Sequence, residues 1–333
     1  MASLITTLPS ISFPHEVDAI DISTTTATIV ELRYADTVIF KSTLHPIDGT
    51  IALRDIASLL YSYLGAKKQT FSVWLDGSKK AETDIIPCTL HLDCTAEEWN
   101  GESLLTRATN KYTHATAKEL IHFTATGASS AKVTIVMQKG GAVSIGEATM
   151  ECASDGDIVA LDVSPSVLPV PEGYELVTYT VEVGKAKMTY RMIPDGMADN
   201  VHEFGFINSF LQEEYITLMG AAERELKVER LHAMVGGQYR NYQVEAVPHW
   251  TIESGMMLEG MEGLFDDFIS SKKVWRKSDG VMMAVTDSDF KVSDANDATC
   301  EGSVTLREAG RTYRHRPVRP VKTFDETFDD TFQ

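Results

Sequence analysis

Short runs of β-branched and aromatic residues, separated by turns that contain glycine, recur along most of this sequence and restrict its fold more than any other feature. Asp76-Gly77 and Gly140-Gly141 each stand between two such runs, and both dipeptides favour the tight turn of a β-hairpin. Around Gly184, residues alternate so that one face of the expected strands is more apolar than the other. We therefore predict a mainly β chain, with hairpins in residues 26–44, 70–83, 132–150 and 174–193.

The same pattern continues in the second half of the chain. Further strands are expected at residues 215–219, 226–233, 239–247, 281–286 and 302–307. Frequent turn signals of this kind are typical of sandwiches or barrels rather than of alternating βαβ units. A chain of 333 residues is long for one core. The segment Pro194–Asn200 (PDGMADN) is the predicted boundary. The prediction is two β-sandwich or barrel-like domains, residues 1–195 and 196–310, and an extended C-terminal tail, residues 311–333.

One amphipathic helix is expected in each domain. Residues 53–64 and residues 256–271 both carry apolar side chains at helical spacing, and Lys272 follows the second segment where the helix dipole favours cations. The second stripe consists of Met257, Leu258, Met261, Leu264, Phe265, Phe268 and Ile269. A third, weaker helix is predicted to begin at Thr95, because Thr-Ala-Glu-Glu can form a capping box. All three helices are expected to pack against cores.

Composition and charge exclude several classes of protein. The chain is 43% hydrophobic and 23% charged, which is ordinary for a folded protein. A net charge of -18 argues against binding to nucleic acid and against adhesion to anionic lipid. No stretch is long and apolar enough to span a bilayer, and the first residues do not resemble a targeting signal. We expect a soluble protein made in a cytoplasm.

Motifs for catalysis or metal binding are not found in the sequence. There is no G-x-S-x-G, P-loop or H-E-x-x-H motif. Cys88 and Cys94 flank His91, but in a strand the two cysteines would be about 20 Å apart with His91 on the other face, so free thiols are expected. The chain is therefore predicted not to be an enzyme and to need no cofactor.

An acidic segment near residue 290 raises the question of calcium binding. Its carboxylates are Asp287, Asp289, Asp294 and Asp297. Calcium prefers such oxygen ligands, but the order of residues is not that of an EF-hand. We interpret the segment as a solvated loop beside a strand and leave calcium binding open.

The last 23 residues combine a basic part with an acidic, phenylalanine-rich part. The basic part carries Arg311, Arg314, Arg316, Arg319 and Lys322 and no acid. The acidic part, residues 323–333, carries Phe324, Phe328 and Phe332, whose spacing lets the three rings face one way in a strand or a helix. Burial of each ring can contribute about 1.5–3 kcal/mol before ordering costs. We predict that the phenylalanines and arginines dock on a partner surface, in the same chain or in a neighbour.

A resemblance to a known family enters through three segments. These are residues 204–220 (FGFINSFLQEEYITLMG), residues 273–294 (KVWRKSDGVMMAVTDSDFKVSD) and the ending FDETFDDTFQ. They resemble a family of virion structural proteins encoded in tailed phages and prophages of Bacteroidetes, usually in the tail or baseplate gene region. The first 195 residues are similar only in texture. The resemblance implies a β-rich tail component that assembles as a ring or multimer in the host cytoplasm, with copies of itself and neighbouring virion proteins as partners.

Two alternatives remain open from the residues. One is a glycan-binding β-sandwich adhesin that uses exposed aromatics among Trp74, Trp99, Trp250 and Trp275. The other is a hydrolase whose carboxylates meet only in the folded chain. We rank the virion protein first and the hydrolase last.

Overall fold

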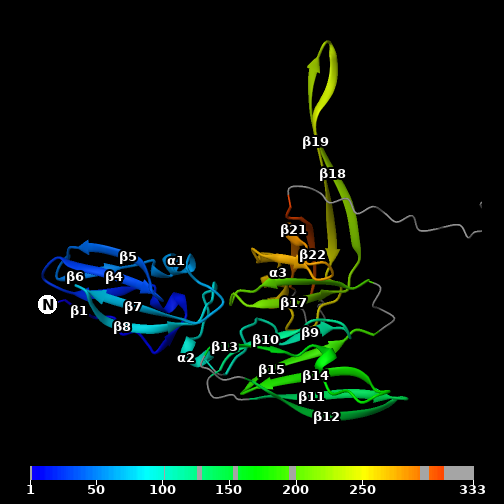
Figure 1. The fold of residues 1–333 in the computed structure, drawn as a ribbon, viewed down its shortest axis with the longest axis horizontal. Coiled ribbons are helices and arrows are strands. Elements are labelled where there is room, and N and C mark those ends of the chain that lie inside the picture. Colours follow the sequence, from blue (N-terminus) through cyan, green and yellow to red (C-terminus); the bar gives the residue numbers. More distant parts are fainter. Residues whose placement is uncertain are drawn as a thin grey trace, which may run out of the picture.

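The computed structural model describes residues 2–100, 102–125, 130–152, 157–194, 200–292 and 300–310. The described chain is mainly β, as predicted (Figure 1). Its strands form five sheets, and none of these closes into a barrel, so the barrel alternative is wrong. All four predicted hairpins are present as antiparallel pairs: β4–β5, β7–β8, β11–β12 and β14–β15.

Residues 2–85 form two sheets around one apolar core. The strands are β1 (Ser3–Leu4), β2 (Ile11–Ser12), β3 (Ile20–Ser23), β4 (Thr28–Tyr34), β5 (Thr37–Leu44), β6 (Thr50–Leu53), β7 (Gln69–Leu75) and β8 (Ser78–Ile85). Their orders are β1-β3-β6 and β2-β8-β7-β4-β5. Val30, Phe71 and Ile20 are fully buried between them. The 3-10 helix η1 (Pro14–Val17) and helix α1 (Ile56–Tyr61) pack together beside this core.

Residues 110–192 form a two-stranded and a five-stranded sheet. The strands are β9 (Asn110–Thr113), β10 (Leu120–Thr124), β11 (Ser130–Lys139), β12 (Ala142–Glu151), β13 (Ile158–Asp162), β14 (Glu175–Val183) and β15 (Ala186–Met192), with the 3-10 helix η2 (Pro165–Val167) after β13. β10 pairs with β13, and the larger sheet has the order β12-β11-β14-β15-β9. The buried rings of Tyr179 and Tyr190 stack 4.6 Å apart on adjacent strands of the larger sheet.

Residues 202–308 form a seven-stranded sheet. Its strands are β16 (His202–Ile207), β17 (Glu213–Leu218), β18 (Ala222–Val235), β19 (Gln238–Glu253), β20 (Val274–Arg276), β21 (Met282–Lys291) and β22 (Glu301–Glu308), in the order β17-β16-β20-β21-β22-β19-β18. Helix α3 (Glu262–Ser270) packs on this sheet through Phe265 and Phe268. Asp267 on α3 holds the helix in place by accepting hydrogen bonds from Ser209 N (3.1 Å) and from Arg107 (3.2 Å).

The apolar cores group the chain differently from the predicted domains. Residues from 104 to 306 share one continuous cluster, which joins the five-stranded sheet of the middle region to the seven-stranded sheet. Residues 2–85 have a separate core. A small third cluster, which includes Phe13, Cys88 and Phe210, connects the two. The predicted boundary at residue 195 lies outside the described residues and stays a prediction.

All three predicted helices exist, but two are shorter than expected. α1 begins at Ile56 because Leu53 still belongs to strand β6 and Asp55 has a left-handed backbone, φ 61°. α3 begins at Glu262 because Gly260 has φ 85°, which interrupts a helix. Met257 and Met261 are buried as expected, but on a loop. Helix α2 (Ala96–Trp99) has the predicted capping box, in which Thr95 accepts from Glu98 N and Glu98 accepts from Thr95 N.

Two segments differ from their predicted conformation. Asp287 and Asp289 lie within strand β21 instead of a loop, because the strand continues to Lys291 by pairing with β22. Asp294 and Asp297 lie outside the described residues. Cys88, His91 and Cys94 lie on a loop and not on a strand. Cys88 is fully buried, and burial raises the pKa of its thiol to about 12.

Candidate assembly surface

The residues predicted to dock on a partner all lie beyond the part of the chain that the structure describes. They are Phe324, Phe328, Phe332, Arg311, Arg314, Arg316 and Arg319. The described chain ends just after β22, whose Arg307 pairs with His249 of β19. His249 lies near the C-terminal end of β19, at the point where that strand leaves the seven-stranded sheet, and the described chain reaches residue 310, three residues after Arg307.

The most prominent surface feature is a long hairpin made by β18 and β19. The two strands have 14 and 16 residues, and they pair from Ala222–Ile252 to Val235–Gln238. Only the part of β19 from His249 to Glu253 also pairs with β22. The remaining part projects away from the rest of the molecule (Figure 1). Residues 226–248 are named the arm.

The turn at the end of the arm follows from two adjacent glycines. Gly236 and Gly237 have φ values of 62° and 76°, and positive φ at both central positions is the geometry of a tight two-residue hairpin turn. Both φ values lie in the region where L side chains are strained, so a glycine pair fits this place. The sequence predicted strands at residues 226–233 and 239–247, and the Gly-Gly dipeptide between them is the signal that indicates their pairing as a hairpin.

One face of the arm is apolar and contains no acid. Side chains alternate along a strand, and the pairing places two sets of residues on the same side. They are Leu226, Val228, Arg230, His232 and Met234 on β18, with Tyr239, Asn241, Val244, Ala246 and Pro248 on β19. The rings of His232 and Tyr239 lie 5.9 Å apart, which agrees with this placement. These ten residues are named the apolar face.

The large side chains of the apolar face are exposed. The exposed fractions are 54% for Leu226, 62% for Met234, 73% for Tyr239 and 54% for Val244. Exposed apolar surface of this extent on one element is typical of a contact with another protein. A two-stranded hairpin with solvent on both sides is also only marginally stable by itself. The arm therefore has the properties of a segment that a partner covers.

The apolar face continues into a hollow at the base of the arm. Arg224 pairs with Trp250, and Ala222 pairs with Ile252, in the same alternation as the face above them. Trp250 and Ile252 line a hollow of about 310 Å³ together with Phe204 and Arg276. The guanidinium carbons of Arg276 and Arg224 lie 5.6 Å and 6.0 Å from the centre of the Trp250 ring. The hollow thus offers an aromatic surface flanked by cations.

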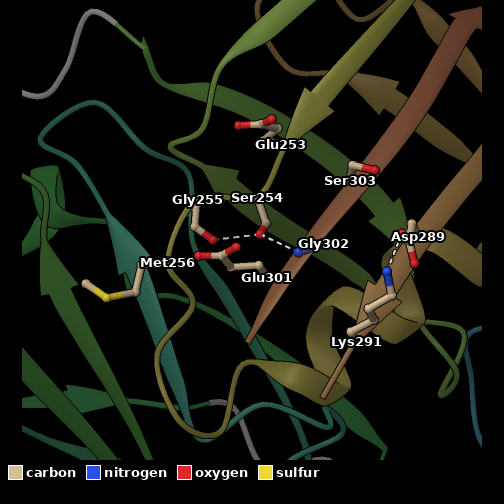
Figure 2. A pocket seen from close by; sticks show the side chains of 9 residues that line it. All are labelled: Glu253, Ser254, Gly255, Met256, Asp289, Lys291, Glu301, Gly302 and Ser303. Atoms are coloured by element: carbon tan, nitrogen blue, oxygen red, sulfur yellow. Dashed lines mark hydrogen bonds and ion pairs between the residues drawn. The ribbon is translucent and has the colours of Figure 1, made fainter. Parts of the chain in front are cut away.

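A second hollow, of about 460 Å³, also lies near the base of the arm, where β19 ends at Glu253 (Figure 2). Glu253, Asp289 and Glu301 give it an acidic lining, and Lys291 forms an ion pair with Asp289 at 3.1 Å. Ser254 Oγ accepts a hydrogen bond from Gly302 N (2.9 Å) and so connects β19 to β22 beneath the hollow. Among the described residues, no group of three or more His, Cys, Asp or Glu side chains is arranged to hold a metal ion.

The strongest concentration of buried charge lies between β9 and β17. Lys111, Glu119 and Glu214 have side chains exposed by 2%, 2% and 4%. Lys111 Nζ lies 2.8 Å from Glu214 Oε1 and 3.8 Å from Glu119 Oε2, and it donates to the carbonyl of Tyr215. Thr106 and Asn208 donate to Glu214 at 2.6 and 2.8 Å. Glu214 is therefore well compensated, whereas Glu119 is the more weakly paired carboxyl.

The electrostatics of this buried cluster follow from that imbalance. Burial raises the pKa of Glu119 to about 7, against the opposing attraction of Lys111. Burial also lowers the pKa of His122, which lies on the adjacent strand β10, to about 4. Perturbed groups of this kind often mark active sites. Here the side chains of Lys111, Glu119 and Glu214 are sealed from solvent, and the ion pair of Lys111 with Glu214 joins β9 of the five-stranded sheet to β17 of the seven-stranded sheet.

Comparison with known proteins adds no assignment. No protein-family model and no curated protein matches this sequence. In the described residues, no helix is long and apolar enough to cross a membrane.

Proposed function

We propose that this chain is a non-enzymatic structural component of a phage or phage-like particle, in the tail or baseplate, and that it assembles as a multimer. The observation that carries the proposal is the projecting arm with its exposed apolar face. Catalysis does not require such a surface, but contact between subunits does. The resemblance of residues 204–220, 273–294 and 324–333 to phage virion proteins supports the particle.

The other parts of the proposal follow from assembly. Two β-rich domains with a docking tail at residues 311–333 would form the subunit, and its partners would be other copies and neighbouring virion proteins. The net charge of -18 makes DNA an unsuitable partner. The subunit would join the virion in the cytoplasm of the bacterial host.

The test is the native mass of the full chain and of a variant with a shortened arm. Replacing residues 230–244 by Asn-Gly keeps every pair from Ala222–Ile252 to Glu229–Glu245 and closes the hairpin with a favourable turn. We expect a defined multimer for the wild type and a monomer for the variant. At protein concentrations low enough for the wild type to dissociate, the two proteins should have the same thermal stability. A wild type that remains monomeric, or a variant that still assembles, would contradict the proposal.

The hollow beside Trp250 is the specific feature that favours the second candidate, a glycan-binding adhesin. An indole ring with neighbouring polar groups is suited to stack on a sugar, and Glu203 and Arg276 line the same hollow. Binding of the monomeric variant to a glycan array, lost in Trp250→Ala, would support the adhesin. The absence of binding would leave assembly as the only one of the two functions with support.

A further inference from the structure

We infer that the apolar face of the arm is the docking site for residues 323–333 of a second copy of this chain. The inference rests on the proposed function and deepens it, because it names the two surfaces that meet between subunits. It is carried by charge, by spacing and by the position at which the 311–333 segment begins.

The two segments are complementary in charge. From Arg230 to Val244 the arm contains two arginines and no acid, in a chain whose net charge is -18. Residues 323–333 contain the four acids Asp325, Glu326, Asp329 and Asp330 and no base. Each segment also carries large apolar side chains. Residues 230–244, the outer part of the arm, are thus a basic and apolar segment of an acidic protein, with Arg230 on the apolar face, and the last eleven residues are its acidic and apolar counterpart.

The spacing of the apolar groups also agrees. Exposed side chains of the apolar face recur every four residues along β18, at Leu226, Arg230 and Met234. Their partners on β19 are the buried Pro248 and the exposed Val244 and Tyr239, in that order. Phe324, Phe328 and Phe332 also recur every four residues. Four residues of extended chain span about 13 Å in both segments. An extended 323–333 segment along β18 therefore brings one phenylalanine to each of the three pairs.

The acids of the segment then meet the cations of the arm. In an extended segment, Glu326 and Asp330 lie on the same side as the three phenylalanines, because side chains alternate. They fall between the apolar pairs, next to Arg230 and His232. This places an opposite charge beside Arg230 without burying an unpaired charge.

A neighbouring copy fits as the donor better than the same chain. β22 runs toward the tip of the arm, and Arg307 already pairs with His249 at the arm's base. In the same chain, the twelve residues 311–322, extended, reach about 40 Å. The ten residues from Pro248 to Tyr239 span only about 30 Å. A same-chain segment that continued fully extended in the direction of β22 would carry Phe324 past the tip and would lay the five basic residues of 311–322 along the arm, where Arg230 and Arg240 would repel them.

The first experiment mixes two variants of the full chain. One is Phe324→Ser/Phe328→Ser/Phe332→Ser, which retains the arm. The other is Met234→Ser/Tyr239→Ser, which retains the tail. We expect each variant alone to be a monomer and the mixture to form a 1:1 complex, because one intact arm then meets one intact tail. Val143→Ser/Ile145→Ser removes equally exposed apolar side chains from edge strand β12 and is expected to leave assembly unchanged.

The second experiment measures binding of a labelled peptide of residues 320–333 to the triple-serine variant. We expect binding that weakens with salt, that is reduced about tenfold or more by Arg230→Glu, and that is restored by a Glu326→Lys peptide. If the wild type and the triple-serine variant both assemble, the inference is overturned and the proposed function stays intact. A peptide that binds while the wild type stays monomeric shows docking within one chain and overturns both.

Discussion

At the scale of single residues, the buried cluster around Lys111 has one cation for two carboxyl groups, and this imbalance determines which carboxyl group has a raised pKa. One cation faces two carboxylates there, and Glu214 receives the short ion pair together with donors from Thr106 and Asn208. Glu119 is left with the longer contact of 3.8 Å. Desolvation of an ion in the interior is costly, so Glu119 is held in its protonated form more strongly than an exposed glutamate.

The stability of the protein should therefore depend on pH through Glu119. Its folded pKa of about 7 lies above the ordinary value of 4.5. The folded state then binds this proton more tightly, and the resulting stability is fully present below pH 4.5 and is lost as the pH rises through 7. A pKa raised from 4.5 to about 7 corresponds to a change of about 3 kcal/mol in the free energy of unfolding. His122 acts in the opposite direction, because its lowered pKa removes stability as the pH falls from 6.5 to about 4.

Substitution Glu119→Gln separates the two effects. We expect the free energy of unfolding of this variant, minus that of the wild type, to be constant below pH 4.5 and to increase by about 3 kcal/mol by pH 8. Urea denaturation at a series of pH values measures it, with Glu172→Gln, an exposed position, as the control. A difference that does not change between pH 4.5 and 8 would mean that burial does not raise the pKa of Glu119.

At the scale of elements, close contacts between strands decide which residues a position accepts. Gly205 on β16 pairs with Trp275 on β20, and the indole ring lies across the space that a side chain would need. A Cβ atom built on Gly205 would overlap with the Trp275 ring. The ring itself packs edge-on against Tyr215, so it cannot move without disturbing a third strand.

Gly205→Ala should therefore destabilise the seven-stranded sheet. Overpacking of this kind costs about 1–3 kcal/mol. Gly65→Ala is the matched control, because a Cβ there meets nothing within 4 Å, and its effect should stay within about 0.5 kcal/mol. Thermal or urea unfolding of the two variants compares them directly. Equal stability of Gly205→Ala and the wild type would show that the Trp275 ring has another position available.

At the scale of the whole molecule, the arm is the part that the cores do not hold. Buried residues between 104 and 306 share one apolar cluster, which includes Ile252 of β19. None of the arm residues 226–248 whose side chains the structure describes is among the buried members of this cluster. The strands of the arm are supported only by each other above the end of β22. Local stability follows such differences in burial.

Amide hydrogen exchange should report this difference. We expect the amides of residues 230–244 to exchange by local opening in the monomeric triple-serine variant, far faster than those of β7, whose residues Phe71 and Val73 are fully buried. In the assembled wild type the same arm amides should become protected. Equal protection of the arm in monomer and multimer would show that the partner contacts another surface.

Much of the local structure could be predicted because its causes are local. Asp76-Gly77 and Gly140-Gly141 favour tight turns in whatever context they occur, and both hairpins formed. Thr95 and Glu98 cap a helix through contacts within four residues. The helical turn expected around Met257 does not form, because the positive φ of Gly260 prevents the helix from beginning before Glu262. The spacing of apolar residues does not indicate this φ value.

The sequence by itself determined the fold class, the hairpins and the chemical character of the surfaces, since alternation, turn residues and charge are properties of neighbouring residues. Only the tertiary structure decided which segments share a core, because Lys111 and Glu214 are separated by about a hundred residues and meet through sheet packing. It also decided that β18 and β19 extend beyond β22, which leaves their apolar side chains exposed. Pairing with strands that are distant in sequence determines which side chains are buried. This difference in burial distinguishes a core strand from the strands of the arm.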